Sequence, residues 1–540
     1  MTTLKTCFLL VLALSAWPAF AHPQWQPLEL RFTASKSHER PATLQVDALF
    51  TAPDGRVMIM PAFWDGGERW GVRFAPTTPG TWTYQLRVSE GADPALAGSS
   101  GSFAVEPAAS DNPLYRNGGF LKVAPSGRYL TYSDGTPFFW LGDTWWFCPS
   151  ELCPIDESSS PKHASMFKAM VATRKAQGYS VAQMLFAGPQ KPPGVLRRPQ
   201  RWSEADVLFW QRMDGYVRHA SEQGLLLVLG VGFSDFLDRA FPVDLRLLWR
   251  YLVARYGAYP VTWLITGEYN SENQDERVRK TDMLGRYLKQ IDPYDRAMSV
   301  HPWQYGGDKR QAWSAPWLDF AMLQGAHGGY PPARIYQEAY AWQPVRPFLE
   351  DEANYEGIHE KNAEIIRTTA YRAIQSGSFG YTYGSHGLWY PIHSPEERID
   401  HIDRWGRPLP WWEALEREGG RQMGHLRKFY ESLPWWRLEP RPDAIETGAM
   451  ASDPRLRVTV KADGDSLFVV HFPPGFPAQS DIRLKGMAVG EPYVTGWFDP
   501  RSGKFLKEST LRVDSPRILL PNKPDRADWV LLLRKPSTVH

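Results

Sequence analysis

The spacing of hydrophobic positions changes twice along the chain and divides it into three regions. In residues 22–111, apolar and polar positions alternate, as in Leu28–Phe32 and Trp82–Val88. Alternation puts every second side chain on one face, which is typical of a strand with one buried side. Turn residues such as Pro53-Asp54-Gly55 separate these runs. This region is therefore predicted to form a β-sandwich.

In residues 112–437, short apolar runs alternate with segments of helical spacing. Most runs are apolar on both faces, as are strands buried in a parallel sheet. Eight strand–helix units within roughly 300 residues predict a (β/α)8 TIM barrel. The predicted strands are Phe138–Leu141, Ser180–Leu185, Leu225–Val231, Val261–Thr266, Ala297–His301, Asp319–Leu323, Pro347–Glu352 and Phe379–Tyr383. The clearest predicted helices are Ala205–Gln223, Leu245–Tyr256 and Asn362–Ser376.

Residues 438–540 return to alternating positions, most regularly in Leu456–Lys461. The turn Asp499-Pro500-Arg501-Ser502-Gly503 lies between two further runs. A second β-sandwich is predicted here. The predicted fold is thus of the α/β class, a TIM barrel flanked by N-terminal and C-terminal β-sandwich domains.

The first 21 residues have the pattern of a cleaved secretory signal peptide. Lys5 precedes the apolar run Phe8–Ala16, and Ala19-Phe20-Ala21 matches a cleavage site. We expect the mature chain to begin at His22 and to be periplasmic or secreted. The apolar run is shorter than the ~20 residues that a membrane-spanning helix needs, and no other stretch is long and apolar enough to cross a bilayer, so no membrane span is predicted.

Charge and cysteine content exclude several function classes. The formal net charge is +2, which predicts no general attraction to nucleic acid or to anionic membranes. Two cysteines follow the signal, Cys148 and Cys153, and they form either a disulfide or two free thiols. The chain has no G-x-G-x-x-G or Walker A loop after a strand, no G-x-S-x-G elbow and no H-E-x-x-H. We therefore predict no cofactor and no metal.

Two of the predicted strands end in a glutamate. Glu268 follows the run Val261–Thr266 and Gly267, and Glu352 closes Pro347–Glu352. Catalytic groups of TIM barrels lie at the carboxyl ends of the strands. Glycoside hydrolysis uses two carboxylates, which lie roughly 5–5.5 Å apart in retaining enzymes. We predict that Glu268 and Glu352 are such a pair; a structural salt bridge is the alternative for Glu268.

The seventh predicted strand has several acids from which to choose. Alternation places Glu350 and Glu352 on one face and Asp351 on the other. Glu352 is nearest the loop end, so it is the predicted catalytic residue.

Aromatic, histidine and amide side chains follow other strand ends. Aromatic rings stack on sugar faces, and polar groups bind sugar hydroxyls. A His-rich metal site is the alternative for the three histidines, and a helix cap is an equally weighted alternative for Asp143. The predicted substrate-binding residues are Asp143, Trp146, Asn270, His301, Trp303, His327, Tyr355, Tyr383, His386 and Trp389.

Several motifs resemble the bacterial apiosidase-like glycoside hydrolases, which are barrel enzymes preceded by a small β-sandwich domain of unknown function. The resemblance covers nearly the whole mature chain. The matching motifs are Pro61–Gly67, Arg73–Pro76, Pro79–Tyr84, Gly127–Leu130, Phe138–Thr144, Ser299–Pro302, Glu352–Gly357, Trp497–Pro500 and Asp528–Val530.

The resemblance implies a retaining mechanism, with an acid/base carboxylate after strand four and a nucleophile after strand seven. These roles fall on Glu268 and Glu352. Relatives often have Gly-Gly-Asp where this chain has Thr266-Gly267-Glu268. We expect the longer side chain to address a differently placed glycosidic oxygen than in an apiosidase. A non-catalytic carbohydrate-binding protein and a polysaccharide lyase are the two rival functions. The sugar, the linkage and the oligomeric state stay open.

Overall fold

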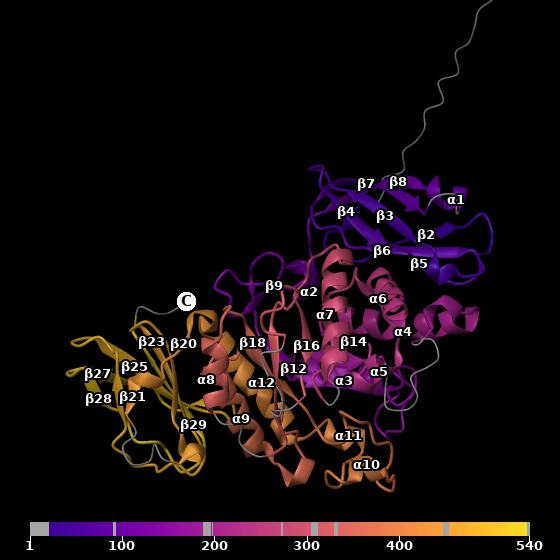
Figure 1. The fold of residues 1–540 in the computed structure, drawn as a ribbon. Coiled ribbons are helices and arrows are strands. Elements are labelled where there is room, and N and C mark those ends of the chain that lie inside the picture. Colours follow the sequence, from indigo (N-terminus) through magenta and orange to yellow (C-terminus); the bar gives the residue numbers. More distant parts are fainter. Residues whose placement is uncertain are drawn as a thin grey trace, which may run out of the picture.

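Three groups of strands follow one another along the chain, as the changes in hydrophobic spacing predict (Figure 1). The computed structural model describes residues 21–89, 93–186, 196, 198–271, 274–303, 312–328, 333–446 and 453–536. The predicted signal peptide lies outside these residues, apart from Ala21. In this part of the chain, no helix is both long enough and apolar enough to span a bilayer.

The N-terminal region is a sandwich of two sheets, with strand orders β1-β8-β7-β3-β4 and β2-β6-β5. Phe50 and Phe74, one from each sheet, stack with their ring centroids 3.8 Å apart, and Trp82 packs against Phe74. The elements are β1 (His22–Pro23), β2 (Leu28–Thr33), η1 (Pro41–Thr43), β3 (Val46–Thr51), β4 (Val57–Pro61), β5 (Phe63–Trp64), β6 (Arg69–Phe74), β7 (Gly80–Val88), α1 (Pro94–Ala97) and β8 (Ser100–Glu106).

The middle region is a parallel barrel, and all eight predicted strands occur in it. The strand order is β16-β15-β14-β13-β12-β19-β18-β17. Between β16 and β17 the barrel is closed by single contacts, such as the Ser299 hydroxyl donating to the Phe320 carbonyl over 2.7 Å. The strands are β12 (Trp140–Thr144), β13 (Val181–Leu185), β14 (Leu226–Gly230), β15 (Val261–Gly267), β16 (Met298–His301), β17 (Ala321–Ala326), β18 (Phe348–Ala353) and β19 (Gly380–Tyr383).

Helices surround the barrel, and the predicted ones agree with the structure to within three residues at each end. Asn362 caps α9, because its side chain accepts a hydrogen bond from the Ile365 N–H over 3.2 Å. The helices are α2 (Pro113–Arg116), α3 (Met166–Ala176), η3 (Pro199–Arg201), α4 (Glu204–Glu222), α5 (Ser234–Arg239), α6 (Pro242–Tyr256), α7 (Gln274–Ile291), α8 (Ala333–Ala341), η4 (Ile358–Glu360), α9 (Ala363–Gln375), α10 (Asp400–Asp403), α11 (Trp411–Ala414), α12 (Glu418–Glu431) and η5 (Trp435–Arg437).

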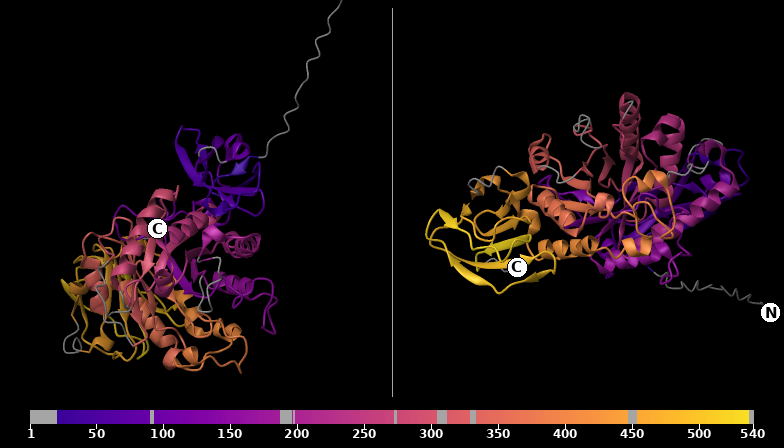
Figure 2. Two further views of the ribbon diagram at one scale, coloured as in Figure 1. Left: turned by 45° about the vertical axis from the view of Figure 1, so that its right-hand side comes forward. Right: turned by 90° about the horizontal axis from the view of Figure 1, so that it is seen from below.

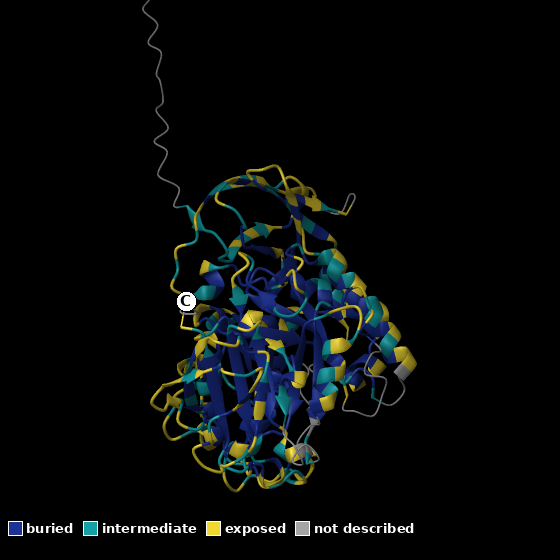
Figure 3. Cartoon of the chain, turned by 90° about the vertical axis from the view of Figure 1, so that its left-hand side faces the viewer, coloured by how far each residue is buried: buried dark blue, intermediate teal, exposed yellow. Residues whose placement is uncertain are grey.

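The first barrel strand begins later than predicted. Pro137–Phe138 forms the short strand β11, which pairs with β10 (Leu130–Thr131) and not with the barrel. Together with β9 (Lys122–Val123), these strands form a small sheet at the amino end of the barrel. Its apolar side chains join the buried interior of the barrel. Figure 3 shows the buried residues at the centre of the molecule in dark blue. The loops at the opposite, carboxyl end of the strands are therefore left to form the functional site.

The C-terminal region is a second sandwich, and it packs on the barrel through α9 and α12 (Figure 2). Arg367 of α9 donates two hydrogen bonds of 2.8 and 2.9 Å to the buried Asp528. The elements are β20 (Glu439–Pro440), η6 (Pro442–Ala444), β21 (Ile445–Glu446), η8 (Pro454–Leu456), β22 (Thr459–Asp463), β23 (Leu467–Phe472), β24 (Arg483–Lys485), β25 (Pro492–Asp499), β26 (Lys504–Phe505), β27 (Ser509–Arg512), β28 (Arg517–Leu519) and β29 (Trp529–Arg534).

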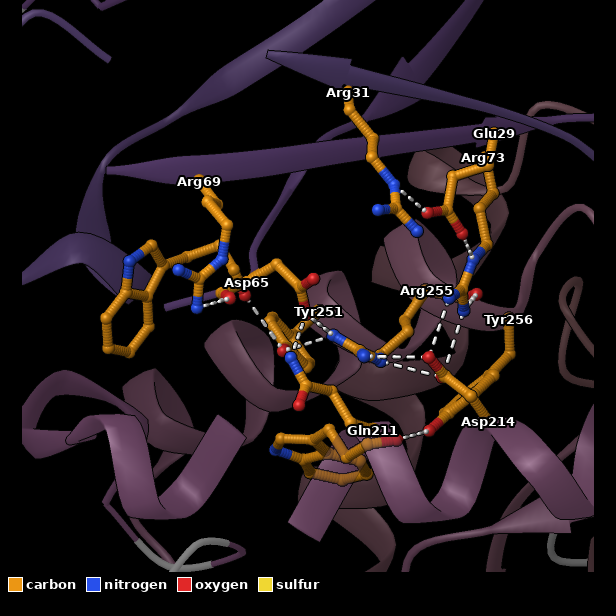
Figure 4. A network of polar contacts seen from close by, with 12 residues as sticks. Glu29, Arg31, Asp65, Arg69, Arg73, Gln211, Asp214, Tyr251, Arg255 and Tyr256 are labelled. Carbon is orange, nitrogen blue, oxygen red and sulfur yellow. Dashed lines mark hydrogen bonds and ion pairs between the residues drawn. The ribbon is translucent and has the colours of Figure 1, made fainter. Parts of the chain in front are cut away.

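A buried ionic network fixes the N-terminal sandwich to the barrel (Figure 4). Arg73 of β6 donates to both oxygens of Asp214 on α4, over 2.9 and 2.6 Å. Arg255 of α6 donates to the same carboxylate over 2.8 and 2.7 Å, and also reaches Asp65 of the sandwich over 3.0 Å. Two arginines thus share one buried carboxylate, and removal of Asp214 would leave both without their main partner.

The two cysteines that follow the predicted signal peptide form a disulfide, Cys148–Cys153. The bond closes a short loop directly after β12, at the carboxyl end of the barrel. Of the two sequence-based alternatives, free thiols are therefore excluded. The exact domain boundaries at residues 111 and 437 stay predictions.

Candidate active site

Glu268 and Glu352 both lie at the carboxyl end of the barrel. Glu352 is the fifth residue of β18, and Glu268 directly follows β15. Glu268 has a left-handed backbone conformation, with φ of 53°, which is uncommon for a residue with a side chain. Such strain is often found at functional sites, where neighbouring contacts hold a side chain in one direction. Here Gly267 lets Phe233 pack directly against the backbone before Glu268.

Three side chains surround the Glu352 carboxylate. His301 Nε2 lies 3.3 Å from Oε2, and His327 Nε2 lies 3.3 Å from Oε1. The indole N–H of Trp146 donates to Oε2 over 3.3 Å. Although burial would raise the pKa of Glu352, the hydrogen bonds from the two histidines and the charge of His301 lower it well below its usual value. Glu352 is therefore held as an anion at neutral pH.

The orientation of His327 follows from its second nitrogen. The backbone N–H of Tyr355 donates to His327 Nδ1 over 3.4 Å, so this nitrogen acts as an acceptor. An imidazole that accepts at Nδ1 has its proton on Nε2. Nε2, which lies 3.3 Å from Glu352 Oε1, can then donate its proton to this carboxylate. Tyr355 also accepts a hydrogen bond from Trp146 over 3.2 Å, which ties the two aromatic residues together beside Glu352.

Glu268 has the opposite electrostatic environment. Burial raises the pKa of its carboxyl to about 7, and the nearby negative charge of Glu352 contributes to the rise. A hydrogen bond from Gln324 and the charge of His301 oppose this effect without cancelling it. At neutral pH, Glu268 is therefore protonated in a large fraction of molecules. Two carboxyl groups whose pKa values are shifted in opposite directions are the arrangement that acid/base chemistry needs.

The faces of β18 differ from the sequence prediction. A β-bulge interrupts its pairing with β17, because Leu323 pairs with Glu350 and the next residue, Gln324, pairs with Glu352. Asp351 is the extra residue, and it points into the barrel together with Glu352. Glu350 points away and accepts from Tyr336 of α8 over 2.6 Å. The prediction that Glu350 and Glu352 share a face was therefore wrong, because strict alternation does not hold across a bulge.

Glu350 has a structural role behind the site. Its Oε1 atom accepts from the Gly325 N–H over 2.9 Å and from the Glu352 N–H over 3.2 Å. Burial raises the pKa of Glu350 to about 8, against the effect of hydrogen bonds from Tyr336 and Gly325. The side chain thus satisfies backbone groups around the bulge and holds β17 against β18.

Several predicted substrate-binding residues lie around this pair. Trp303 is 39% exposed, and its backbone N–H donates to the buried Asn270 side chain over 2.6 Å. Trp389 is partly exposed, and its ring centroid lies 6.4 Å from that of Tyr355. His386 orients Trp389, because its Nδ1 accepts from the indole N–H over 3.2 Å. Trp303 follows β16 and Trp389 follows β19, so the two indoles come from different loops at the carboxyl end of the barrel.

Two predicted binding residues, Asp143 and Tyr383, point away from Glu268 and Glu352. Asp143 is fully buried and forms an ion pair of 2.6 Å with Arg174 of α3. Tyr383 is also buried and donates to Glu356 over 2.6 Å, while Arg174 lies over its ring. Both side chains point from the barrel toward the surrounding helices. They stabilise the barrel–helix contact, and the structure does not place them beside Glu268 and Glu352.

Sequence reasoning missed several residues of the site. Gln324 forms a hydrogen bond with Glu268, and its side-chain oxygen, Oε1, is buried and has no hydrogen-bond partner among the described residues. Asp351 accepts from His301, and Trp405 packs against His327 with ring centroids 5.6 Å apart. Gln324 lies on a predicted strand end, but Trp405 lies in a long loop after β19, where no periodic pattern marks it.

No three His, Cys, Asp or Glu side chains are arranged to hold a metal ion among the described residues. His301 and His327 instead each contact Glu352, and His386 contacts the Gly406 carbonyl. The three histidines therefore have protein partners in this structure.

Comparison with protein families decides the class of this site. The model of the apiosidase-like catalytic domain matches residues 124–437, which is more than half of the chain. The chain belongs to the apiosidase-like family. It is therefore a glycoside hydrolase, and its substrate is a carbohydrate. Residues 21–89 of the N-terminal sandwich match DUF5060, a domain of unknown function.

Solved structures agree on the fold of this apiosidase-like enzyme. A protein described as a glycoside hydrolase is 22% identical, with a TM-score of 0.63, and the match covers 78% of this chain and 97% of that one. A glycoside hydrolase family 5 protein from Bacteroides vulgatus ATCC 8482 is 21% identical, with a TM-score of 0.66 and coverages of 78% and 95%. A third structure, from the same strain, is 16% identical with a TM-score of 0.67 and covers 95% and 99%. A comparison with curated proteins gives no significant match.

Loss of the exposed indole of Trp303 is expected to weaken substrate use without destabilising the protein. In the Trp303→Ala variant, kcat/KM should fall about tenfold or more, since ~1.4 kcal/mol of lost contact corresponds to tenfold. The melting temperature should stay close to that of the unmodified enzyme. Trp436 of η5 is similarly exposed, at 41%, but lies away from the strand ends. Trp436→Ala is the matched control, and equal kinetics of the two variants would contradict a binding role for Trp303.

Proposed function

We propose that this enzyme is a retaining glycoside hydrolase, with Glu352 as nucleophile and Glu268 as acid/base. The observation that carries the proposal is that the pKa values of the two carboxyl groups are shifted in opposite directions. Glu352 is anionic because His301, His327 and Trp146 surround it. Glu268 is protonated near neutral pH because it is buried near that negative charge. An anionic nucleophile facing a protonated acid is the starting state of the double-displacement reaction.

The two steps use these groups in turn. In the first step, the Glu352 carboxylate attacks the anomeric carbon, while Glu268 gives its proton to the departing glycosidic oxygen. The negative charge is then lost from Glu352, so the pKa of Glu268 is expected to fall. In the second step, Glu268 is therefore a base, and it removes a proton from the water that releases the sugar.

The surroundings favour hydrolysis over the two rival functions. A protein that only binds glycan has no need for two carboxyl groups with oppositely shifted pKa values. A lyase needs a free base such as Tyr or His. Burial holds the pKa of Tyr355 well above its usual value, and His301 and His327 both contact Glu352. We also propose that Trp146, Asn270, His301, Trp303, His327, Tyr355, His386 and Trp389 form or support the sugar-binding surface, and that the enzyme is exported to the periplasm or secreted.

The pH profile of kcat/KM tests the role of Glu268. Because Glu268 must be protonated in the free enzyme and its pKa is raised to about 7, kcat/KM should fall above pH 7, by roughly tenfold per pH unit. Below pH 7 the rate should stay level until Glu352 takes up a proton, and its lowered pKa places this at strongly acidic pH. Steady-state kinetics with an aryl glycoside across this range measures both limits.

The Glu268→Ala variant is the control for this profile. With an activated aryl leaving group, which needs no protonation, its alkaline limit should disappear. An alkaline limit that persists unchanged in Glu268→Ala would mean that another group supplies the proton.

A further inference from the structure

Asp351 lies fully buried in the barrel beneath the nucleophile, where three donors from three strands meet its carboxylate. His301 Nδ1 of β16 is 2.8 Å from Oδ2, and the Thr382 hydroxyl of β19 donates to Oδ1 over 2.9 Å. The third donor is the Gln183 amide of β13, which lies 2.8 and 3.2 Å from the two oxygens. The Gln183 nitrogen faces Asp351, because the opposite orientation would set a carbonyl oxygen against the carboxylate.

His301 connects this carboxylate to the nucleophile. Its Nδ1 faces Asp351, and its Nε2 faces Glu352 Oε2 at 3.3 Å. A neutral imidazole has one nitrogen without a proton, and that nitrogen would repel whichever carboxylate it faced. Only the doubly protonated ring satisfies both neighbours. Burial would lower the pKa of His301, but Asp351 and Glu352 together raise it to about 10.

The bulge in β18 makes this arrangement possible. In a regular strand, Asp351 and Glu352 would point to opposite faces. The extra residue turns both carboxylates toward His301, one to each nitrogen. A buried charge is unfavourable unless it is paired, and the ionisable partner of Asp351 is His301, which also contacts Glu352. This cost suggests that Asp351 serves the reaction.

We propose that Asp351 is a positioning residue, which keeps His301 doubly protonated and directed at Glu352 and so makes Glu352 a better leaving group in the second step. This inference rests on the proposed retaining function. In that step, water attacks the anomeric carbon and gives a proton to Glu268. The ester bond from the anomeric carbon to Glu352 breaks, and its electron pair returns to the carboxylate. A cation beside Oε2 stabilises the charge that forms there.

The other charged groups near this pair do not replace Asp351. Glu352 also faces His327, Glu268 and Tyr355, and the charge of His301 reaches Glu268. Of these groups, His327 supports the anion at Oε1, whereas Glu268 opposes it. Among the described residues, Asp351 is the hydrogen-bond partner of His301 Nδ1. Removal of the Asp351 charge should therefore raise the pKa of Glu352, because His301 would lose its positive charge.

The Asp351→Asn variant tests the proposal with an activated aryl glycoside that the unmodified enzyme cleaves. Asparagine keeps the shape of the side chain and removes its charge, so His301 should lose its second proton. The acid limit of kcat/KM should then rise by about one to two pH units, the usual effect of one nearby charge. Slower release of the sugar should make the glycosyl-enzyme accumulate, which rapid-quench kinetics detects as a burst of aryl alcohol.

Asp143→Asn is the matched control. Asp143 is an equally buried aspartate on β12, which is separated from β18 by β19, but its partner is Arg174 on the helical side. Its loss should lower the melting temperature and leave the acid limit and the burst unchanged. An Asp351→Asn variant with the same acid limit and the same burst behaviour as Asp143→Asn would overturn the proposal, because Asp351 would then be only structural.

A double variant keeps the test decisive if Asp351→Asn does not fold. His301→Gln/Asp351→Asn removes both members of the buried ion pair, which is less destabilising than removal of one. Because Asp351 acts through His301, this variant and His301→Gln should have the same acid limit. A further shift in the double variant would contradict the proposal. Failure of the retaining function itself would be distinguishable, because the unmodified enzyme would then release an inverted product and form no glycosyl-enzyme.

Discussion

Replacing Glu352 by alanine is expected to lower kcat on every substrate by on the order of 10⁴- to 10⁶-fold, the loss typical of a missing nucleophile. No other described carboxylate is placed to substitute for it. Asp351 bonds His301, Thr382 and Gln183, and Glu350 points to α8. Steady-state kinetics measures the loss, with a thermal melt to show that the variant is folded.

Azide provides the chemical check on this variant. The missing side chain of Glu352→Ala leaves room for a small anion beside His301 and His327. Azide should attack the anomeric carbon from the side that Glu352 uses, restore part of the activity and give a glycosyl azide of inverted configuration. Glu352→Gln is the control, because its amide fills the space and azide should not restore it. Equal rescue of the two variants would show that azide does not occupy the position of the nucleophile.

Replacing Glu268 by alanine is expected to have an effect that depends on the leaving group. With a natural glycosidic bond or another poor leaving group, kcat should fall by about 10²- to 10⁴-fold, the usual contribution of general acid catalysis. With an activated aryl group, such as a dinitrophenyl glycoside, the first step should be nearly unaffected. The buried carboxyl with its pKa raised to about 7 is the group that supplies the proton.

A series of aryl glycosides with graded leaving groups measures this dependence. The plot of log kcat/KM against the leaving-group pKa should be steeper for Glu268→Ala than for the unmodified enzyme. Gln324→Leu is a useful companion, because Gln324 bonds Glu268 but has no proton to give at neutral pH. Its slope should stay close to that of the unmodified enzyme. Parallel slopes for Glu268→Ala and the unmodified enzyme would assign the acid role to another residue.

The architecture could be predicted because each barrel strand is apolar on both faces. Every strand of a parallel barrel ends at the same rim. Locating the ends of the strands before Glu268 and Glu352 was therefore enough to place both glutamates at that rim. This is why His301, His327 and Trp146 could also be predicted to lie beside the glutamates, as the structure places them.

Side-chain direction was harder to predict, because it depends on register within a single strand. Asp143 and Tyr383 lie one position away from inward-facing residues, so they point to α3 and its neighbours. The bulge at Asp351 is set by pairing between β17 and β18, and no local pattern in either strand indicates it. Register errors of one residue reverse the face of a side chain. The sequence therefore predicts the strands more reliably than it predicts which side chains at the strand ends point into the site.

The anomeric configuration of the first product tests directly whether Glu352 is the nucleophile. If Glu352 is the nucleophile, its carboxyl should lie roughly 5–5.5 Å from that of Glu268, and two displacements at one carbon retain its configuration. Proton NMR of a reaction started with an aryl glycoside of known anomeric configuration shows the first sugar released before mutarotation. We expect this sugar to have the same anomeric configuration as the substrate. An inverted anomer from the unmodified enzyme would contradict the assignment of Glu352 as nucleophile.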